Sequence, residues 1–242
     1  MAQHISRRDL KRDEVRETFT HGAEAVALHK TGVAIAVGVV IVVLAAVFGW
    51  RYYAAHQTTA ASAALGDALT VYNARIRAAG EPAQPNEVTY VDEKNKWQDA
   101  ARKFDDIVAK YGRTRPGQQA DFYAAICYEN LGNYAQAEKD LKAVEDAGDA
   151  DLAPLARFQH AELYNRMGKP TDAANLYHQL LTTSSVLVPK PLVMLGLANV
   201  YAKTNPTEAA KMLNQIKTDY PGTAAADEAD KLLETSATAP KT

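Results

Sequence analysis

Residues 120–144, ADFYAAICYENLGNYAQAEKDLKAV, contain the pattern that decides the fold. Apolar residues recur at helical spacing on both sides of Gly132, with Ala125 and Tyr128 before it and Ala137 and Leu141 after it. Gly132 suits the left-handed backbone conformation that follows a helix end. The stretch therefore predicts two helices joined by a tight turn.

The same pattern returns with a period of 36 residues. Five sets of positions superpose at this spacing: Ala125, Ala161 and Leu197; Tyr128, Tyr164 and Val200; Ala137, Ala173 and Ala209; Leu141, Tyr177 and Leu213; Val144, Leu180 and Ile216. One such set could arise by chance, but five in one register indicate a true repeat. A helical hairpin cannot bury its apolar face alone, so repeated hairpins are expected to stack on their neighbours.

These residues resemble the tetratricopeptide repeat, a helical hairpin motif. Residues 120–144 and 156–181 match its small, aromatic and turn-glycine positions, the second through Ala161, Tyr164 and Gly168. Residues 192–221 match less well, with Thr204 in place of the turn glycine, and 97–111 could be an earlier half-unit. The resemblance implies an all-α superhelix of about three units and a protein that binds other proteins.

Turn signals divide the remaining chain. Residues 52–79 have a helical apolar pattern, and 80–91 (GEPAQPNEVTYV) read as a loop because of their glycine and prolines. We find no alternating strand pattern and expect helices at 93–111, 116–131, 134–147, 151–167, 170–183, 189–203, 206–219 and 223–235. Pro116, Pro170 and Pro206 suit first helical turns, and the last helix should cap the array with Ala225, Ala229, Leu232 and Leu233 facing inward.

Residues 31–50, TGVAIAVGVVIVVLAAVFGW, contain no charge. A helix of this length spans roughly 30 Å, the thickness of the hydrocarbon core of a bilayer. Lys30 and Arg51 bracket the segment, and Trp50 lies at its end, where interfacial aromatic residues gather. We therefore predict a transmembrane helix. A buried core helix and a cleaved signal peptide are the alternatives, although a signal peptide has a shorter apolar region and a shorter leader.

Basic residues set the expected orientation. Six Lys or Arg residues precede the segment, and only Arg51 follows it before Arg75. The positive-inside rule then places residues 1–30 in the cytoplasm and the large C-terminal part outside it. The leader could be simply solvated or could form an amphipathic helix on the membrane surface. We expect a cytoplasmic leader (1–30), a transmembrane helix (31–50), a membrane-proximal helix and loop (51–92), the repeat domain (93–235) and a disordered tail (236–242).

This layout also resembles the single-span ancillary subunit of the bacterial Sec translocon. That resemblance implies a scaffold in the inner membrane whose periplasmic domain contacts translocon subunits, chaperones or secreted chains. A cell-envelope or cell-division organiser and a non-catalytic regulatory subunit of a membrane enzyme are the alternatives.

The tetratricopeptide repeat resemblance also implies a binding face, because the first helix of each unit lines the concave side. The candidate protein-binding residues in equivalent positions are Phe122, Phe158 and Met194, then Glu129 and Tyr201, then Asn130 and Arg166. Large side chains here are natural anchors for an extended peptide or a helix. The three apolar residues could instead pack against a neighbouring helix. Some family members grip a terminal carboxylate with basic residues, but Gln119, Phe122, Ile126 and their equivalents cannot form that clamp.

Catalytic chemistry finds little support in the sequence. The six histidines show no metalloprotease spacing, no glycine-rich phosphate loop is present, and His160 and His178 lack a third metal ligand. The lone cysteine, Cys127, sits at a helix position typical of a buried thiol. A net charge of −2 and a pI of about 6.3 argue against nucleic acid as a partner. We expect no enzyme activity, no cofactor and no metal.

Overall fold

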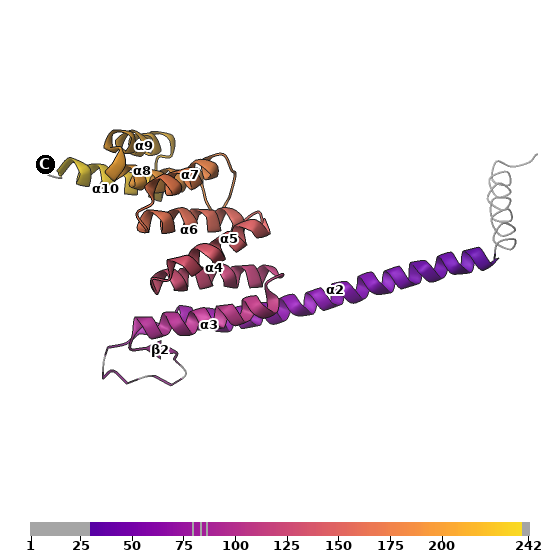
Figure 1. Ribbon diagram of the computed structural model, residues 1–242. Coiled ribbons are helices and arrows are strands. Elements are labelled where there is room, and N and C mark those ends of the chain that lie inside the picture. Colours follow the sequence, from indigo (N-terminus) through magenta and orange to yellow (C-terminus); the bar gives the residue numbers. More distant parts are fainter. Residues whose placement is uncertain (1–29, 79, 83, 86, 239–242) are drawn as a thin grey trace, which may run out of the picture. The chain divides into compact units, whose positions relative to one another are not determined.

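The computed structural model describes residues 30–78, 80–82, 84–85 and 87–238 (Figure 1). Its helices are α2 (Lys30–Tyr72), α3 (Glu93–Tyr111), α4 (Arg115–Asn130), α5 (Tyr134–Ala147), α6 (Leu152–Arg166), α7 (Pro170–Leu181), α8 (Lys190–Thr204), α9 (Pro206–Asp219) and α10 (Ala224–Thr238). The predicted all-α class is confirmed. Residues 1–29 of the expected cytoplasmic leader lie outside the described residues, as do residues 239–242 of the expected tail. The first three residues of that tail, Ser236, Ala237 and Thr238, are helical and belong to α10, which corrects the prediction of disorder for them.

A short strand pair corrects the prediction that the region after the apolar segment contains no strands. β1 (Arg75–Ile76) pairs in parallel with β2 (Thr89–Tyr90) at the two ends of the loop that follows α2. Two residues are too few for alternation to be visible in the sequence. The strand pair closes the loop between α2 and α3, so the end of α2 lies close in space to the start of α3.

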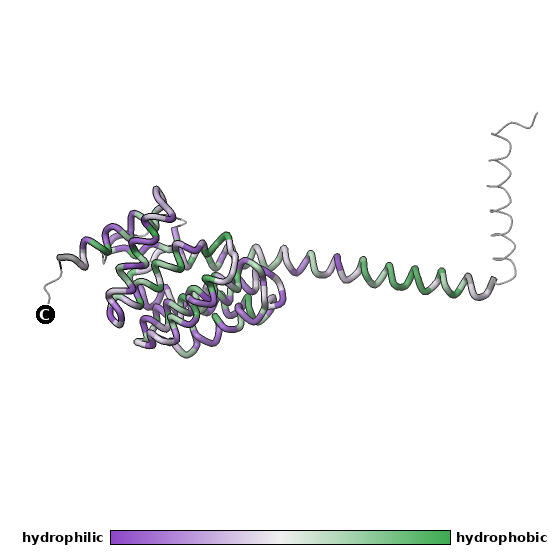
Figure 2. The backbone as a smooth tube through the Cα atoms, turned by 90° about the horizontal axis from the view of Figure 1, so that it is seen from above, coloured by the Kyte–Doolittle hydropathy of each residue, from purple (hydrophilic) through white to green (hydrophobic). Residues whose placement is uncertain are grey.

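The chain divides into two compact units, Met1–His56 and Gln57–Thr242, and α2 contributes to both. In the first unit, the apolar side chains of α2 are exposed, with Ile35 at 64% and Phe48 at 69% exposure. Figure 2 shows this part of α2 as a continuous hydrophobic stretch, whereas the repeat helices alternate between hydrophobic and hydrophilic residues. Among the described residues, Ala34–Tyr72 is the one segment long and apolar enough to cross a membrane by length and composition.

In the second unit, Gln57–Tyr72 of α2 acts as the first helix of the array. Its residues Leu65, Ala68 and Val71 are buried in a cluster with Phe104 of α3 and Cys127 of α4. The sequence-based division placed this helix with the membrane-proximal region and began the repeat domain at residue 93. The structure groups residues 57–72 with the repeats, because α3 packs its apolar face against this part of α2.

Consecutive helices then pack as hairpins: α4 with α5, α6 with α7, and α8 with α9, while α10 packs on α8 and α9. All members of the five repeating sets are buried except Tyr128 and Tyr164, which are partly buried. The capping residues of α10 pack against the C-terminal cluster as predicted. The 36-residue repeat therefore supplies a continuous core.

Local signals fix the helix ends. Gly132 and Gly168 adopt φ of 75° and 71° after α4 and α6, the left-handed conformation that only glycine takes without strain. Thr114 caps α4 by accepting a hydrogen bond from the Gly117 amide at 3.2 Å. Prolines occupy the first turns of α4, α7 and α9, as their spacing predicted.

Candidate functional site

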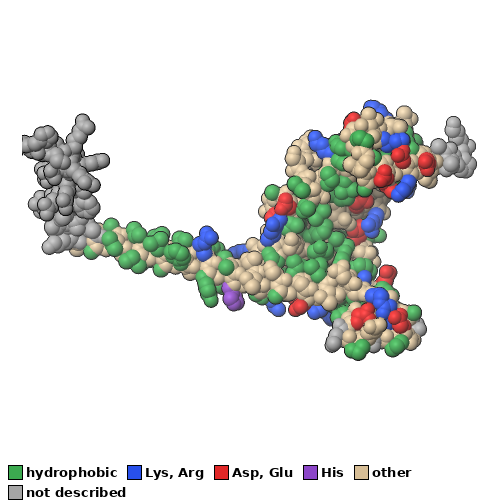
Figure 3. All heavy atoms as spheres, turned by 180° about the vertical axis from the view of Figure 1, so that it is seen from behind, with side chains coloured by type: hydrophobic (Ala, Val, Ile, Leu, Met, Phe, Trp, Pro, Cys, Tyr) green, Lys and Arg blue, Asp and Glu red, His purple; other side chains and the backbone are tan. Residues whose placement is uncertain are grey.

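The first helices of the hairpins form one face of the array, which we call the A-helix face. Its members are Gln57–Tyr72 of α2 and the helices α4, α6 and α8, and α4 contacts α6 directly, as α6 contacts α8. Figure 3 shows hydrophobic side chains gathered in the middle of the repeat domain, with charged side chains toward the edges. Partly buried apolar residues on these helices include Tyr123, Ile126, Leu155 and Phe158.

An aromatic cluster joins the first helices at the N-terminal end of the array. The Tyr72 ring of α2 meets the rings of Trp97 at 5.5 Å and Tyr123 at 5.2 Å, both edge-on, and Tyr123 stacks on Phe104 at 5.5 Å. Edge-on and offset pairs of this kind are favourable beyond the area that they bury. The cluster holds α2, α3 and α4 together and leaves Tyr72 and Tyr123 partly exposed.

The apolar candidates split between core and surface. Phe122 is 8% exposed and Met194 7% exposed, and each lies in a hydrophobic cluster. Both therefore pack against neighbouring helices, which was the alternative to a role in binding. Phe158 is only partly buried, and its ring meets Tyr177 edge-on at 5.6 Å. Phe158 and Ile126 therefore offer more surface to a ligand than the other two do, and Ile126 was not among the predicted binding residues.

Two of the polar candidates are brought together between α4 and α6. The carboxylate of Glu129 lies 3.1 Å from Arg166 Nε and accepts a hydrogen bond from Gln159 Nε2 at 2.7 Å. Asn130 is exposed and donates to the Ile126 carbonyl of its own helix at 2.8 Å. Tyr201 is partly buried, with its hydroxyl 3.0 Å from His178 Nε2.

Comparison with known proteins identifies the architecture. A family model described as a tetratricopeptide repeat-like domain matches residues 28–183, and a tetratricopeptide repeat model matches 192–223. The chain belongs to the tetratricopeptide repeat-like (TPR-like) domain family. The first match covers more than half of the chain and includes the apolar part of α2.

The comparison with solved structures shows only weak similarity. Crystal structures of the putative kinesin light chain TPR-like repeats of Podosopora anserina, one of them a variant, share 17% identity with this chain at a TM-score of 0.46. The matches cover 60% of this chain and 87% or 88% of theirs. No curated protein matches the chain.

A buried carboxylate, that of Asp140, lies inside the first complete TPR hairpin beside the partly buried Asp121, and the sequence pattern did not predict its burial. Asp140 of α5 is 6% exposed, and burial together with the nearby Asp121 carboxylate raises its pKa to about 7. Its Oδ1 accepts from Gln136 Nε2 at 2.7 Å, while the buried Oδ2 accepts no hydrogen bond from the described residues. Burial and the Asp105 carboxylate raise the pKa of Asp121 to about 6. We therefore expect the stability of this hairpin to depend on pH.

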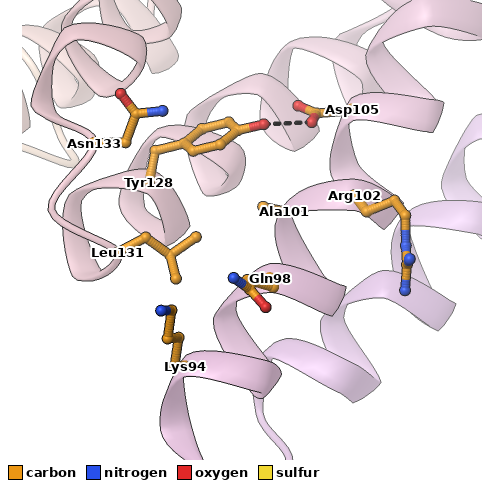
Figure 4. Close-up of a pocket in the computed structure, with 8 residues that line it drawn as sticks. All are labelled: Lys94, Gln98, Ala101, Arg102, Asp105, Tyr128, Leu131 and Asn133. Carbon is orange, nitrogen blue, oxygen red and sulfur yellow. Dashed lines mark hydrogen bonds between the residues drawn. The ribbon is translucent and has the colours of Figure 1, made fainter.

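A pocket of about 310 Å³ opens between α3 and the turn from α4 to α5 (Figure 4). Leu131, Ala101 and the Tyr128 ring line it alongside polar groups of Lys94 and Gln98. Figure 4 shows Asp105 turned toward Tyr128, whose hydroxyl donates to it at 2.5 Å. The Arg102 guanidinium is ion-paired with Asp99 at 2.5 Å. Two of the lining charges are thus already engaged.

The cysteine and histidine side chains that could take part in catalysis, Cys127 and His160, are buried in the core or held in ion pairs. Burial raises the pKa of the Cys127 thiol to about 12, which keeps it protonated and unreactive. His160 is buried, with Nδ1 2.8 Å from Glu145, which also pairs with Arg157 at 3.1 Å. Among the described residues, no group of three or more His, Cys, Asp or Glu side chains could hold a metal ion. The TPR units supply surface for protein binding, and such domains are typically non-catalytic.

Proposed function

We propose that this protein is a membrane-anchored scaffold that binds other proteins on the extracytoplasmic side of a bacterial inner membrane. The observation that carries the proposal is the composition of α2. Its first part is an exposed apolar helix without charge from residue 31 to 50, and from Gln57 the same helix supplies the first member of the repeat array. A helix that exposes so many large apolar side chains needs an apolar environment, which a bilayer provides.

The A-helix face supports the binding role. It presents partly exposed Tyr123, Ile126 and Phe158 across neighbouring helices, and aromatic and aliphatic anchors of this kind dominate the energetics of protein interfaces. Lys and Arg are concentrated before the apolar segment, which favours a cytoplasmic leader and a periplasmic repeat domain. We propose that the partners are translocon subunits, periplasmic chaperones or secreted chains in transit, because a domain held at the outer side of the membrane is close to chains that emerge there.

One experiment tests both the location and the binding face. Cys127 is buried, so the unmodified chain should not react with a membrane-impermeant maleimide. The variant Ile126→Cys places a thiol on the A-helix face, and Lys142→Cys places one at an exposed position on α5 of the same hairpin. Each variant is treated in intact spheroplasts with an impermeant maleimide that carries a photocrosslinker.

We expect both variants to be labelled without permeabilisation and I126C to crosslink translocon, chaperone or secreted proteins that K142C does not. Labelling that requires permeabilisation would overturn the proposed location. Efficient labelling with identical crosslinks from both positions would overturn the binding face. Capture of division or wall-synthesis proteins would replace the translocation role with that of an envelope organiser.

A further inference from the structure

The carboxylate of Glu129 is buried between two first helices and lacks a full set of partners. Glu129 lies in the last turn of α4 and its side chain is only 2% exposed. Gln159 donates to one oxygen, but Oε1 accepts no hydrogen bond from the described residues even though Arg166 Nε lies 3.1 Å away. The contact with Arg166 is thus an ion pair without hydrogen-bond alignment. A buried carboxylate in this state is costly, and a better-placed donor would stabilise it.

The charge around Glu129 is unbalanced. Burial is the main cause that raises the pKa of Glu129, and the Glu162 carboxylate of α6 raises it further by repulsion. The Tyr177 hydroxyl donates to Glu162, but this neutral group adds no positive charge. The charged groups that act on Glu129 are thus one guanidinium, that of Arg166, and one further carboxylate, that of Glu162. A second cation would correct the excess negative charge.

The guanidinium of Arg166 can move away from Glu129 into solvent. Its side chain is 56% exposed, whereas the carboxylate that it covers is almost fully buried. Moving the guanidinium into solvent would bury no new polar group and would open Glu129 Oε1 toward the surface. A cation that arrives along the A-helix face could then occupy this position.

Apolar side chains flank the two acids on both helices. Ile126 precedes Glu129 by three residues on α4, and Phe158 precedes Glu162 by four residues on α6, so each apolar residue shares a helix face with an acid. Ile126 and Phe158 are both partly exposed. The surface therefore complements a segment in which apolar residues surround one positive charge.

We propose that the A-helix face selects extended protein segments that carry a lysine or arginine between apolar residues. The incoming cation binds Glu129 in place of Arg166, with Glu162 beside it, and the apolar residues of the segment pack on Ile126 and Phe158. This inference rests on the proposed function, because it specifies the chemistry of the partner that the same face binds.

The test uses the full chain in detergent micelles and three fluorescein-labelled ten-residue peptides. Each peptide alternates leucine and serine around one central residue, which is lysine, acetyl-lysine or glutamate. Acetyl-lysine keeps the length of the side chain and removes its charge. We expect the lysine peptide to bind about tenfold more tightly than the acetyl-lysine peptide and the glutamate peptide to bind most weakly.

Three variants assign this preference to the site. Glu129→Gln should lose the preference for lysine over acetyl-lysine, whereas Glu228→Gln, which removes an exposed acid on α10, should keep it. Arg166→Ala should bind the lysine peptide several-fold more tightly, because the competing cation is gone. Thermal melts of each variant confirm that the fold is retained.

The outcomes separate this inference from the proposed function. Equal binding of the lysine and acetyl-lysine peptides, or weaker lysine binding by R166A, would overturn the cation site and leave a binding face without charge preference. If no peptide binds and the photocrosslinker on I126C captures nothing, the binding face itself is wrong.

Discussion

At the scale of single residues, the repeat domain combines well-satisfied turns with a few costly buried acids. Gly132 and Gly168 adopt the left-handed conformation, and Pro116, Pro170 and Pro206 lie in first helical turns, as their sequence positions predicted. The burial of Asp140 and Glu129 does not follow from the sequence, where Asp140 reads as an ordinary charged helix residue and Glu129 as a candidate binding residue. Their burial results from the neighbouring helices, and it raises the pKa of both carboxyl groups.

Asp140→Asn should stabilise the protein at alkaline pH. The folded-state pKa of Asp140 is about 7, above its ordinary value of 3.8, so the folded chain binds more protons than the unfolded chain between these values. The stability of the native chain should therefore fall as pH rises from about 4 to about 7. The variant lacks this loss and should be about 1–2 kcal/mol more stable than the native chain at pH 8.

Thermal melts at pH 4, 6 and 8 measure this effect. Asp146→Asn makes the same chemical change at an exposed position of α5 and serves as the control. A constant difference between D140N and the native chain at every pH would show that Asp140 does not titrate in this range.

At the scale of elements, the packing of α7 against α8 depends on one missing side chain. A Cβ at Gly196 would lie 2.6 Å from the Tyr177 Cζ and hydroxyl oxygen. Tyr177 is fully buried and donates to Glu162, so its ring has no room to move. Leu197 shares its repeat position with the small residues Ala125 and Ala161. In the structure Leu197 is buried, and the close approach falls one residue earlier.

Gly196→Ala should destabilise the repeat domain by about 2 kcal/mol, because overpacking a close helix contact costs about 1–3 kcal/mol. Gly66→Ala is the matched control, since Gly66 lies exposed in α2 with no atom within 4 Å of an added Cβ. The control should gain up to about 1 kcal/mol from helix propensity. Urea unfolding measures both changes, and a loss of stability as large in G66A as in G196A would contradict the contact as the cause.

At the scale of the whole molecule, α2 serves two different environments. Its first part exposes apolar side chains and its last part buries Leu65, Ala68 and Val71 in the repeat core. Residues 57–72 therefore belong to the folded domain and not to a spacer. This dual use explains why a domain boundary placed at residue 93 misses the first helix of the array.

Two truncated chains test this division. The chain 57–242 keeps every residue of the repeat core, and we expect it to fold, to melt cooperatively and to leave the membrane fraction in alkaline carbonate. We expect the full chain to stay in that fraction. The chain 74–242 lacks the α2 residues that cover Phe104 and should melt at a temperature lower by at least about 5 °C or aggregate. Equal melting temperatures for the two truncated chains would assign residues 57–72 to the anchor instead.

The sequence alone determined the helix class, the 36-residue period, the turn glycines and the apolar segment, because each depends on local propensity and periodicity. It also brought Glu129 and Arg166 forward as candidates. Only the tertiary structure decided that these two residues pair, that Phe122 and Met194 are core, that Asp140 is buried and that α2 begins the array. These features depend on which residues meet across helices distant in the chain, and a periodic pattern identifies an apolar or polar face without specifying its neighbour.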